Sequence, residues 1–151
     1  MASRAFSASA LIPAPPQDVY AVFADYHHSH PQILPKPPFA GLTVEQGGVG
    51  AGTVIMAHMR VLGQTQHFRA TVTEPEPGRV LVETTDTGYI TTFQVEPRAN
   101  GRQSYVTITT ELTGRTGLAG AIEGWLVARM LRPAYVRELA NVAAFVAARA
   151  R

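Results

Sequence analysis

The spacing of apolar residues changes along this chain, and that change restricts the fold more than any other feature of the sequence. From residue 41 to residue 113 apolar and polar side chains alternate, which is the period of a β-strand with one buried face. Turn-forming residues interrupt this region roughly every ten positions. After Gly117 the apolar residues recur at helical spacing almost to the C-terminus. We therefore expect an antiparallel sheet followed by one long helix.

Six strands fit the alternating region. The connections between them are short, so we expect consecutive strands to pair antiparallel as a meander. A further strand is expected near the N-terminus, where the sequence alternates weakly before Pro13. The seven expected strands are residues 5–12, 42–46, 53–61, 65–74, 79–85, 89–96 and 104–113.

Helical segments lie on both sides of the six strands. Prolines and Asp18 in the first turn favour a helix that starts near residue 16, and apolar residues follow at spacings of three and four up to Tyr26. Residues 32–34 can form one more turn before the prolines at 35–38 exclude helix. Pro133 lies inside the last helix, and we expect it to kink that helix near Arg129.

Composition excludes several classes of site. The chain has 151 residues, 46% apolar and 16% charged, which is typical of one globular domain. It has no cysteine, so disulfides, thiolate zinc sites and cysteine nucleophiles are excluded. We see neither the apolar run of a signal peptide nor a stretch long enough for a membrane span, and we therefore expect a cytoplasmic protein without integral membrane association.

The charge pattern gives no sign of a nucleic-acid partner. The net charge is only +2, and Lys36 is the single lysine among the 13 basic residues. The arginines are spread over strands, turns and helix, whereas a nucleic-acid surface needs a clustered basic face with stacking aromatic residues. Arg129, Arg132 and Arg137 are expected on the solvated face of the last helix, with their stems over apolar surface.

The order of elements and three local patterns resemble the START-like (SRPBCC) superfamily, which includes polyketide cyclases, plant pathogenesis-related allergens and lipid-transfer domains. The patterns are PPQDVYAVFADY at residues 15–26, the glycine-bounded hairpins, and the last helix with its internal proline. GTV at 52–54, Gly63 and FRATVTEP at 68–75 look like the polyketide cyclase/dehydrase branch. The resemblance covers the whole chain, residues 1–151, as one domain.

This resemblance implies an α+β helix-grip fold, in which a curved antiparallel seven-stranded sheet surrounds a long C-terminal helix. It also implies a cavity between sheet and helix that takes a small, largely apolar ligand of aromatic, polyketide or lipid-like character. The superfamily shares no common catalytic motif, so no catalytic residue is carried over to this chain. We expect no cofactor.

Turn length decides which side chains face this cavity. If Asp86-Thr87 is a two-residue loop, Tyr89 pairs with Thr84 and Thr91 pairs with Val82, and the same register turns Glu83 outward, beside Arg69. An interior filled by packing alone is the alternative for such an apolar face. The expected ligand-binding residues are Phe68, Ala70, Val82, Thr84, Tyr89, Thr91, Phe93 and Thr110 on the strands, and Trp125, Leu126 and Met130 on the last helix.

His58 has two alternative orientations. With a two-residue turn at Leu62-Gly63, its neighbours on the strand face inward and His58 faces water. One more residue in the loop turns His58 inward, where it could act near Tyr89 as a general acid or base. A hydrogen-bonded structural histidine is the commoner role.

A second group of histidines could be interpreted as a metal site. His27, His28 and His30 follow Asp25, and imidazole and carboxylate groups are zinc ligands. Adjacent histidines point apart, however, and the segment is a helix-breaking turn without a distant partner. We therefore expect an exposed turn and no metal site.

Three functional hypotheses follow from the sequence. The first is a binding module for a small apolar ligand. The second is a polyketide cyclase or dehydratase that uses His58 and Tyr89, and the third is a partner-binding regulator in which the pocket is incidental. Ligand identity and oligomeric state do not follow from the sequence.

Overall fold

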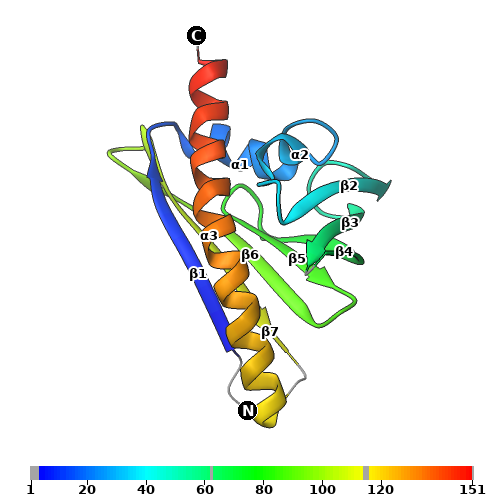
Figure 1. The fold of residues 1–151 in the computed structure, drawn as a ribbon. Helices are drawn as coiled ribbons and strands as arrows, with labels where there is room; N and C mark the ends of the chain where they lie inside the picture. The colour runs from blue at the N-terminus through cyan, green and yellow to red at the C-terminus, as the bar shows by residue number, and fades with distance from the viewer. Residues whose placement is uncertain (1–3, 62, 114–115, 151) are drawn as a thin grey trace.

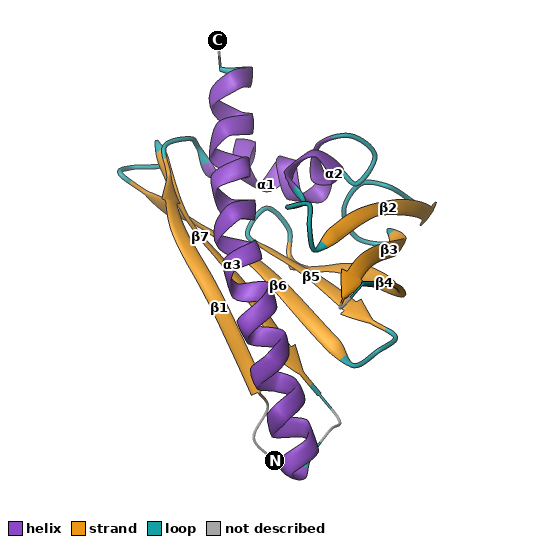
Figure 2. Ribbon diagram, viewed as in Figure 1, coloured by secondary structure: helices purple, strands orange, loops and turns teal. Residues whose placement is uncertain are grey.

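The computed structural model describes residues 4–61, 63–113 and 116–150, which form a curved antiparallel sheet crossed by one long helix (Figures 1 and 2). The predicted α+β helix-grip fold and its order of elements are confirmed. The elements are β1 (Arg4–Ile12), α1 (Pro16–Ala24), α2 (Ser29–Ile33), β2 (Phe39–Gln46), β3 (Val54–Val61), β4 (Gln64–Glu76), β5 (Val80–Thr85), β6 (Tyr89–Arg98), β7 (Gln103–Leu112) and α3 (Gly117–Arg149).

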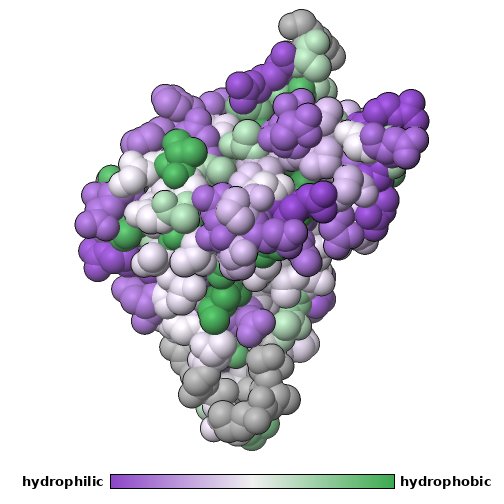
Figure 3. Space-filling view, turned by 180° about the vertical axis from the view of Figure 1, so that it is seen from behind, coloured by the Kyte–Doolittle hydropathy of each residue, from purple (hydrophilic) through white to green (hydrophobic). Residues whose placement is uncertain are grey.

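The sheet follows the predicted meander and is completed by the first strand. Its order is β1-β7-β6-β5-β4-β3-β2, so every strand from β2 to β7 pairs with its neighbour in sequence. β1 joins the free side of β7, with Ala8 opposite Ile108. Strands β2 to β4 curl around one side of α3 (Figure 1). Seen from behind, the molecule is mostly hydrophilic or neutral, with separate hydrophobic side chains (Figure 3).

The C-terminal half of α3 provides much of the core. Ala134, Tyr135, Leu139 and Val142 are buried at four or less per cent exposure, beside the sheet and α1. Burial of an aliphatic side chain such as Leu139 contributes about 1.5–3 kcal/mol. α1 and α2 lie next to this half of α3 (Figure 1), and the side-chain amide of Asn141 donates to the Ile33 carbonyl at 2.9 Å.

The N-terminal half of α3 is more exposed. α3 has 33 residues and continues through Pro133, and its axis changes direction near the middle (Figure 1). In the described chain, no helix combines the length and the apolar character that a membrane crossing requires.

The β5–β6 connection differs from the prediction by one residue. Thr84 pairs with Ile90, so the loop consists of the three residues 86–88 instead of two. Its last residue, Gly88, has φ +93°, a left-handed conformation that favours glycine and that ends this type of hairpin loop. The hydroxyl of Thr85 closes the loop, because it accepts from the Tyr89 N–H and donates to the Tyr89 carbonyl, both at 2.9 Å.

This extra residue reverses the faces of β5. Glu83 pairs with Thr91 and faces the interior, whereas Val82 and Thr84 face outward. The predicted contact between Glu83 and Arg69 is therefore wrong. Arg69 instead binds Glu45 on the outer face, with Nε 2.6 Å from the carboxylate.

The β3–β4 connection follows the first of the two predicted alternatives. Val61 pairs with Gln64, which leaves two residues in the loop. Leu62 itself lies outside the described residues. Ile55, Ala57 and Met59 are buried on the inner face, and His58 is on the outer face.

Candidate functional site

A cavity of about 360 Å³ lies between the concave face of the sheet and α3. This volume is within the usual range of small-molecule sites. Residues of α2 and of every strand from β2 to β7 contribute to its walls. The apolar lining residues are Leu34, Phe39, Leu42, Ile55, Ala57, Met59, Val61, Phe68, Phe93, Val127, Met130 and Leu131.

The cavity has an outer and an inner end. The lining residues Gln66, His67 and Thr87 are exposed, and they lie close to the β3–β4 and β5–β6 connections. Thr113 lies beside the second of these, because its backbone N–H donates to the Gly88 carbonyl at 2.8 Å. Residues 114 and 115, which lead into α3, are outside the described part. At the opposite end the lining residues are buried, which makes this the inner end.

Four titratable side chains meet at the inner end. The Tyr26 hydroxyl donates to the Glu83 carboxylate at 2.6 Å. His30 stacks on the Tyr26 ring with 4.4 Å between centroids, and its Nε2 lies 3.9 Å from Glu83 Oε2. The other ring nitrogen of His30, Nδ1, lies 2.7 Å from the Phe23 carbonyl. Since a carbonyl only accepts, Nδ1 carries a proton.

Glu138 of α3 is the fourth of these side chains, and it is only 2% exposed. Its Oε2 has no hydrogen-bond partner among the described residues. Burial in the first place, and then the negative charge of Glu83, raise the pKa of Glu138 well above that of an ordinary carboxyl group. This environment therefore favours the protonated, uncharged form of Glu138.

A chain of hydroxyl groups continues the polar lining. The hydroxyls of Thr91 and Thr110 are 2.8 Å apart, and Thr110 is 2.6 Å from the Tyr135 hydroxyl. Burial raises the pKa of Tyr135, so this group stays neutral. Toward the outer end, the Tyr89 hydroxyl donates to the Glu123 carboxylate at 2.5 Å.

Six of the eleven predicted ligand-binding residues line the cavity, and five do not. Ala70 is buried on the inner side of β4 but is not part of the lining. Val82 and Thr84 face outward because of the three-residue loop. The six that line the cavity are Phe68, Tyr89, Thr91, Phe93, Thr110 and Met130.

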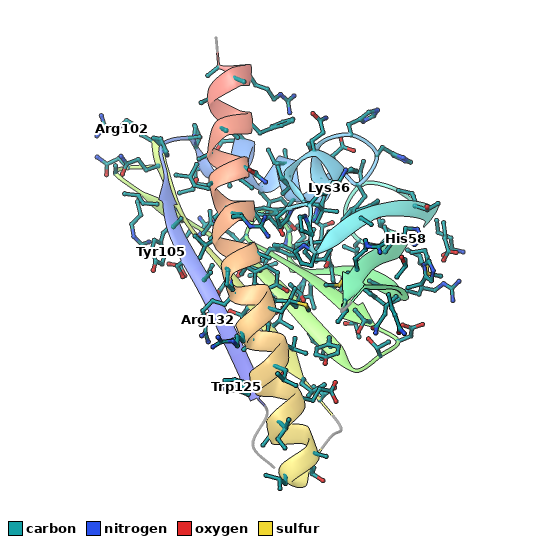
Figure 4. All side chains as sticks on the ribbon, in the orientation of Figure 1. Lys36, His58, Arg102, Tyr105, Trp125 and Arg132 are labelled. Atoms are coloured by element: carbon teal, nitrogen blue, oxygen red, sulfur yellow. The ribbon has the colours of Figure 1, made fainter. Side chains whose placement is uncertain are left out.

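The remaining two, Trp125 and Leu126, were also placed wrongly. They are 61% and 53% exposed, and Figure 4 shows Trp125 on the N-terminal half of α3. Glu123, Val127 and Met130 are the residues of this half that reach the cavity, at spacings of four and three. The intervening side chains consequently point to other sides of the helix.

His58 does not line the cavity. Its Nδ1 lies 2.5 Å from Nδ1 of His67 on the outer side of β3 and β4, and Figure 4 shows it on the part of the sheet away from α3. The hypothesis of a catalytic His58 near Tyr89 required the inward orientation. That geometric condition is not met.

The buried polar cluster was missed from the sequence. His30 was expected in an exposed turn but is 2% exposed inside α2. Glu83 was missed because of the register of β5. Glu138 had a usable signal, since it interrupts an apolar helical face between Tyr135 and Val142.

The chain matches the family described as polyketide cyclase / dehydrase and lipid transport over residues 3–147. It belongs to this family. The family resemblance expected from the sequence is therefore confirmed. A search of curated proteins found no match.

Solved structures of other proteins share this fold. The KanY protein is 28% identical, with a TM-score of 0.81 over 97% of this chain and 99% of its own. An aromatase/cyclase from Streptomyces sp. R1128 is 16% identical, with a TM-score of 0.73 over 99% and 97%. A START superfamily protein from Mycobacterium smegmatis is 15% identical, with a TM-score of 0.65 over 93% and 94%. The last two similarities concern the fold alone.

Proposed function

We propose that this protein binds a small, largely apolar molecule in the cavity between the sheet and α3. The observation that carries this proposal is the lining, which is apolar along the walls and has a few buried polar groups at the inner end. Binding sites for small molecules have this composition, since apolar surface supplies affinity and a few polar groups fix orientation. Membership of a family described by cyclase, dehydrase and lipid-transport activities supports it further. We retain the cytoplasm as the expected location.

Occupancy of the cavity can be tested with a neutral fluorescent probe. N-phenyl-1-naphthylamine should bind at one site per chain with a negative heat-capacity change, because apolar surface is removed from water. The variant Ala57→Phe places a large side chain in the wall and should abolish binding. Met56→Phe is the matched control, because Met56 is the adjacent residue on the outer face of β3.

Two results would contradict the proposal. One is the absence of binding by this probe and by a broad panel of apolar compounds. The other is unchanged probe affinity in Ala57→Phe, since the probe would then occupy another part of the surface.

An enzyme of the cyclase or dehydratase type is the alternative function. Such a reaction needs a group that gives or accepts a proton inside the cavity. His58 lies outside it, whereas Glu138, whose raised pKa favours the protonated form, and the neighbouring Glu83 are carboxyl groups inside it that could exchange protons with a substrate. Mass spectrometry of a poly-β-ketone incubated with the protein would test this alternative, with loss of water or a new ring as the positive result. An unchanged substrate would count against it.

A further inference from the structure

Carboxyl groups are the commonest ionisable groups among the cavity-lining residues that the structure describes. Among the described residues that line the cavity, three are glutamates and none is lysine or arginine, and of the two histidines only His30 lies at the inner end. Glu123, near the outer end, accepts a hydrogen bond from Tyr89. Glu83 and Glu138 lie together at the inner end with no arginine or lysine of the described lining between them. A carboxylate ligand would meet repulsion at this end, and a cation would be attracted.

Glu138 also restricts the orientation of a bound ligand. A buried oxygen without a hydrogen-bond partner costs free energy, and the loss is recovered when a donor reaches it. Oε2 of Glu138 is such an oxygen among the described residues, and Glu138 is part of the cavity wall. Glu83 has one donor, Tyr26, and an ionised carboxylate can accept more than one hydrogen bond. Both carboxyl groups can therefore accept N–H donors from a ligand.

We propose that the ligand is an apolar amine whose ammonium group sits between the carboxyl groups of Glu83 and Glu138. The apolar remainder would lie against walls such as Ile55, Phe68 and Phe93. This inference rests on the proposed binding function and adds the charge and orientation of the ligand.

Proton release should accompany binding. Four further titratable groups lie near Glu138 or Glu83. Glu83 of β5, Tyr26 between α1 and α2, and Tyr135 of α3 act on Glu138, and His30 of α2 contacts Glu83. Burial and the charge of Glu83 raise the pKa of Glu138, and an ammonium group at this position would lower it. Glu138 therefore loses its proton when the amine binds. Amine affinity should fall in acid, because protons compete with the ammonium group at Glu138.

Isothermal titration calorimetry with three probes tests the proposal. The probes share a naphthalene ring and differ in the polar end: 2-(2-naphthyl)ethylamine, 2-(2-naphthyl)ethanol and 2-naphthylacetate. At neutral pH the amine should bind about tenfold or more tightly than the alcohol, and the carboxylate should bind most weakly. Titrations in buffers of different ionisation enthalpy should show proton release for the amine and none for the alcohol.

Glu138→Gln and Glu111→Gln form a matched pair of variants. Both replace a carboxyl by an amide, but Glu111 alternates with the inward residues Thr110 and Leu112 and so lies on the outer face of β7. In Glu138→Gln the preference for amine over alcohol and the proton release should disappear. Glu111→Gln should retain both.

The outcomes separate the two proposals. Equal affinity for amine and alcohol, or tightest binding of the carboxylate, would overturn the charge assignment and leave apolar binding intact. Unchanged selectivity in Glu138→Gln would also overturn it. Failure of every probe, the neutral dye included, would overturn the binding function itself. If Glu138→Gln does not fold, the affinity order and proton release of the wild-type protein decide the question.

Discussion

Replacement of Glu138 by glutamine should change how stability depends on pH. Glutamine has nearly the same shape as a protonated glutamate but cannot ionise. In the folded protein, burial and Glu83 raise the pKa of Glu138, whereas in the unfolded chain a glutamate has a pKa of about 4.3. Above that value the folded state holds a proton that the unfolded state has released. The stability of the wild-type protein therefore falls as pH rises, until the pKa of the folded state is reached.

The expected magnitude follows from this difference in bound protons. One proton corresponds to about 1.4 kcal/mol of unfolding free energy per pH unit. From pH 5 upward the Glu138→Gln variant should therefore gain stability relative to the wild type until the folded-state pKa of Glu138 is reached, and at most roughly 3 kcal/mol by pH 7. Groups distant from Glu138 contribute equally in both proteins, so their contributions cancel in the comparison.

Urea unfolding followed by circular dichroism at several pH values measures this difference. Glu111→Gln is the control, and its stability should follow that of the wild type over the same range. A difference between Glu138→Gln and wild type that stays constant from pH 5 to pH 7 would refute the reasoning. Glu138 would then ionise in the folded protein as it does in water.

Three further predictions concern neighbouring parts of the structure. Tyr26→Phe removes the donor to Glu83 and should lower the unfolding free energy by about 1–3 kcal/mol, and a loss below about 0.5 kcal/mol in urea unfolding would contradict the role of this hydrogen bond. His58→Gln should leave probe affinity unchanged and stability within about 0.5 kcal/mol, so a large loss of affinity in titration would show that His58 acts on the cavity. Ligand should protect the amides of residues 86–88 from hydrogen exchange more than those of residues 75–78, and the reverse order would place the opening at the opposite end.

The order of elements and most of the strand pairing could be predicted from sequence, because local properties determine them. Alternating apolar residues require one buried face, and glycine and proline mark the connections. The alternation of apolar residues fixes the position of each strand better than it fixes the number of residues in the turns between strands. One additional residue in the 86–88 loop reversed the orientation of β5 and brought Glu83 into the cavity in place of Val82 and Thr84.

The cavity surface of α3 could not be assigned for a different reason. This helix has apolar residues on more than one side, and apolar character alone does not say which side contacts the sheet. Trp125 and Leu126 are exposed, whereas Glu138 is buried. The polar cluster combines residues from three separate segments of the chain, and the local sequences around His30 and Glu83 are ordinary. Only their meeting in space gives them unusual properties.

The pairing of β1 with β7 has a consequence for how the chain folds. Ser9 and Thr107 face each other across this pair at a sequence separation of 98 positions, and their hydroxyls are 2.9 Å apart. β1 therefore leaves the ribosome long before its partner strand exists. Pairing over such a separation carries a large loop-closure entropy, which slows folding. Until β1 pairs with it, β7 has an unpaired edge that can pair with another chain. Newly made protein is therefore most vulnerable to aggregation before the β1–β7 pair has formed.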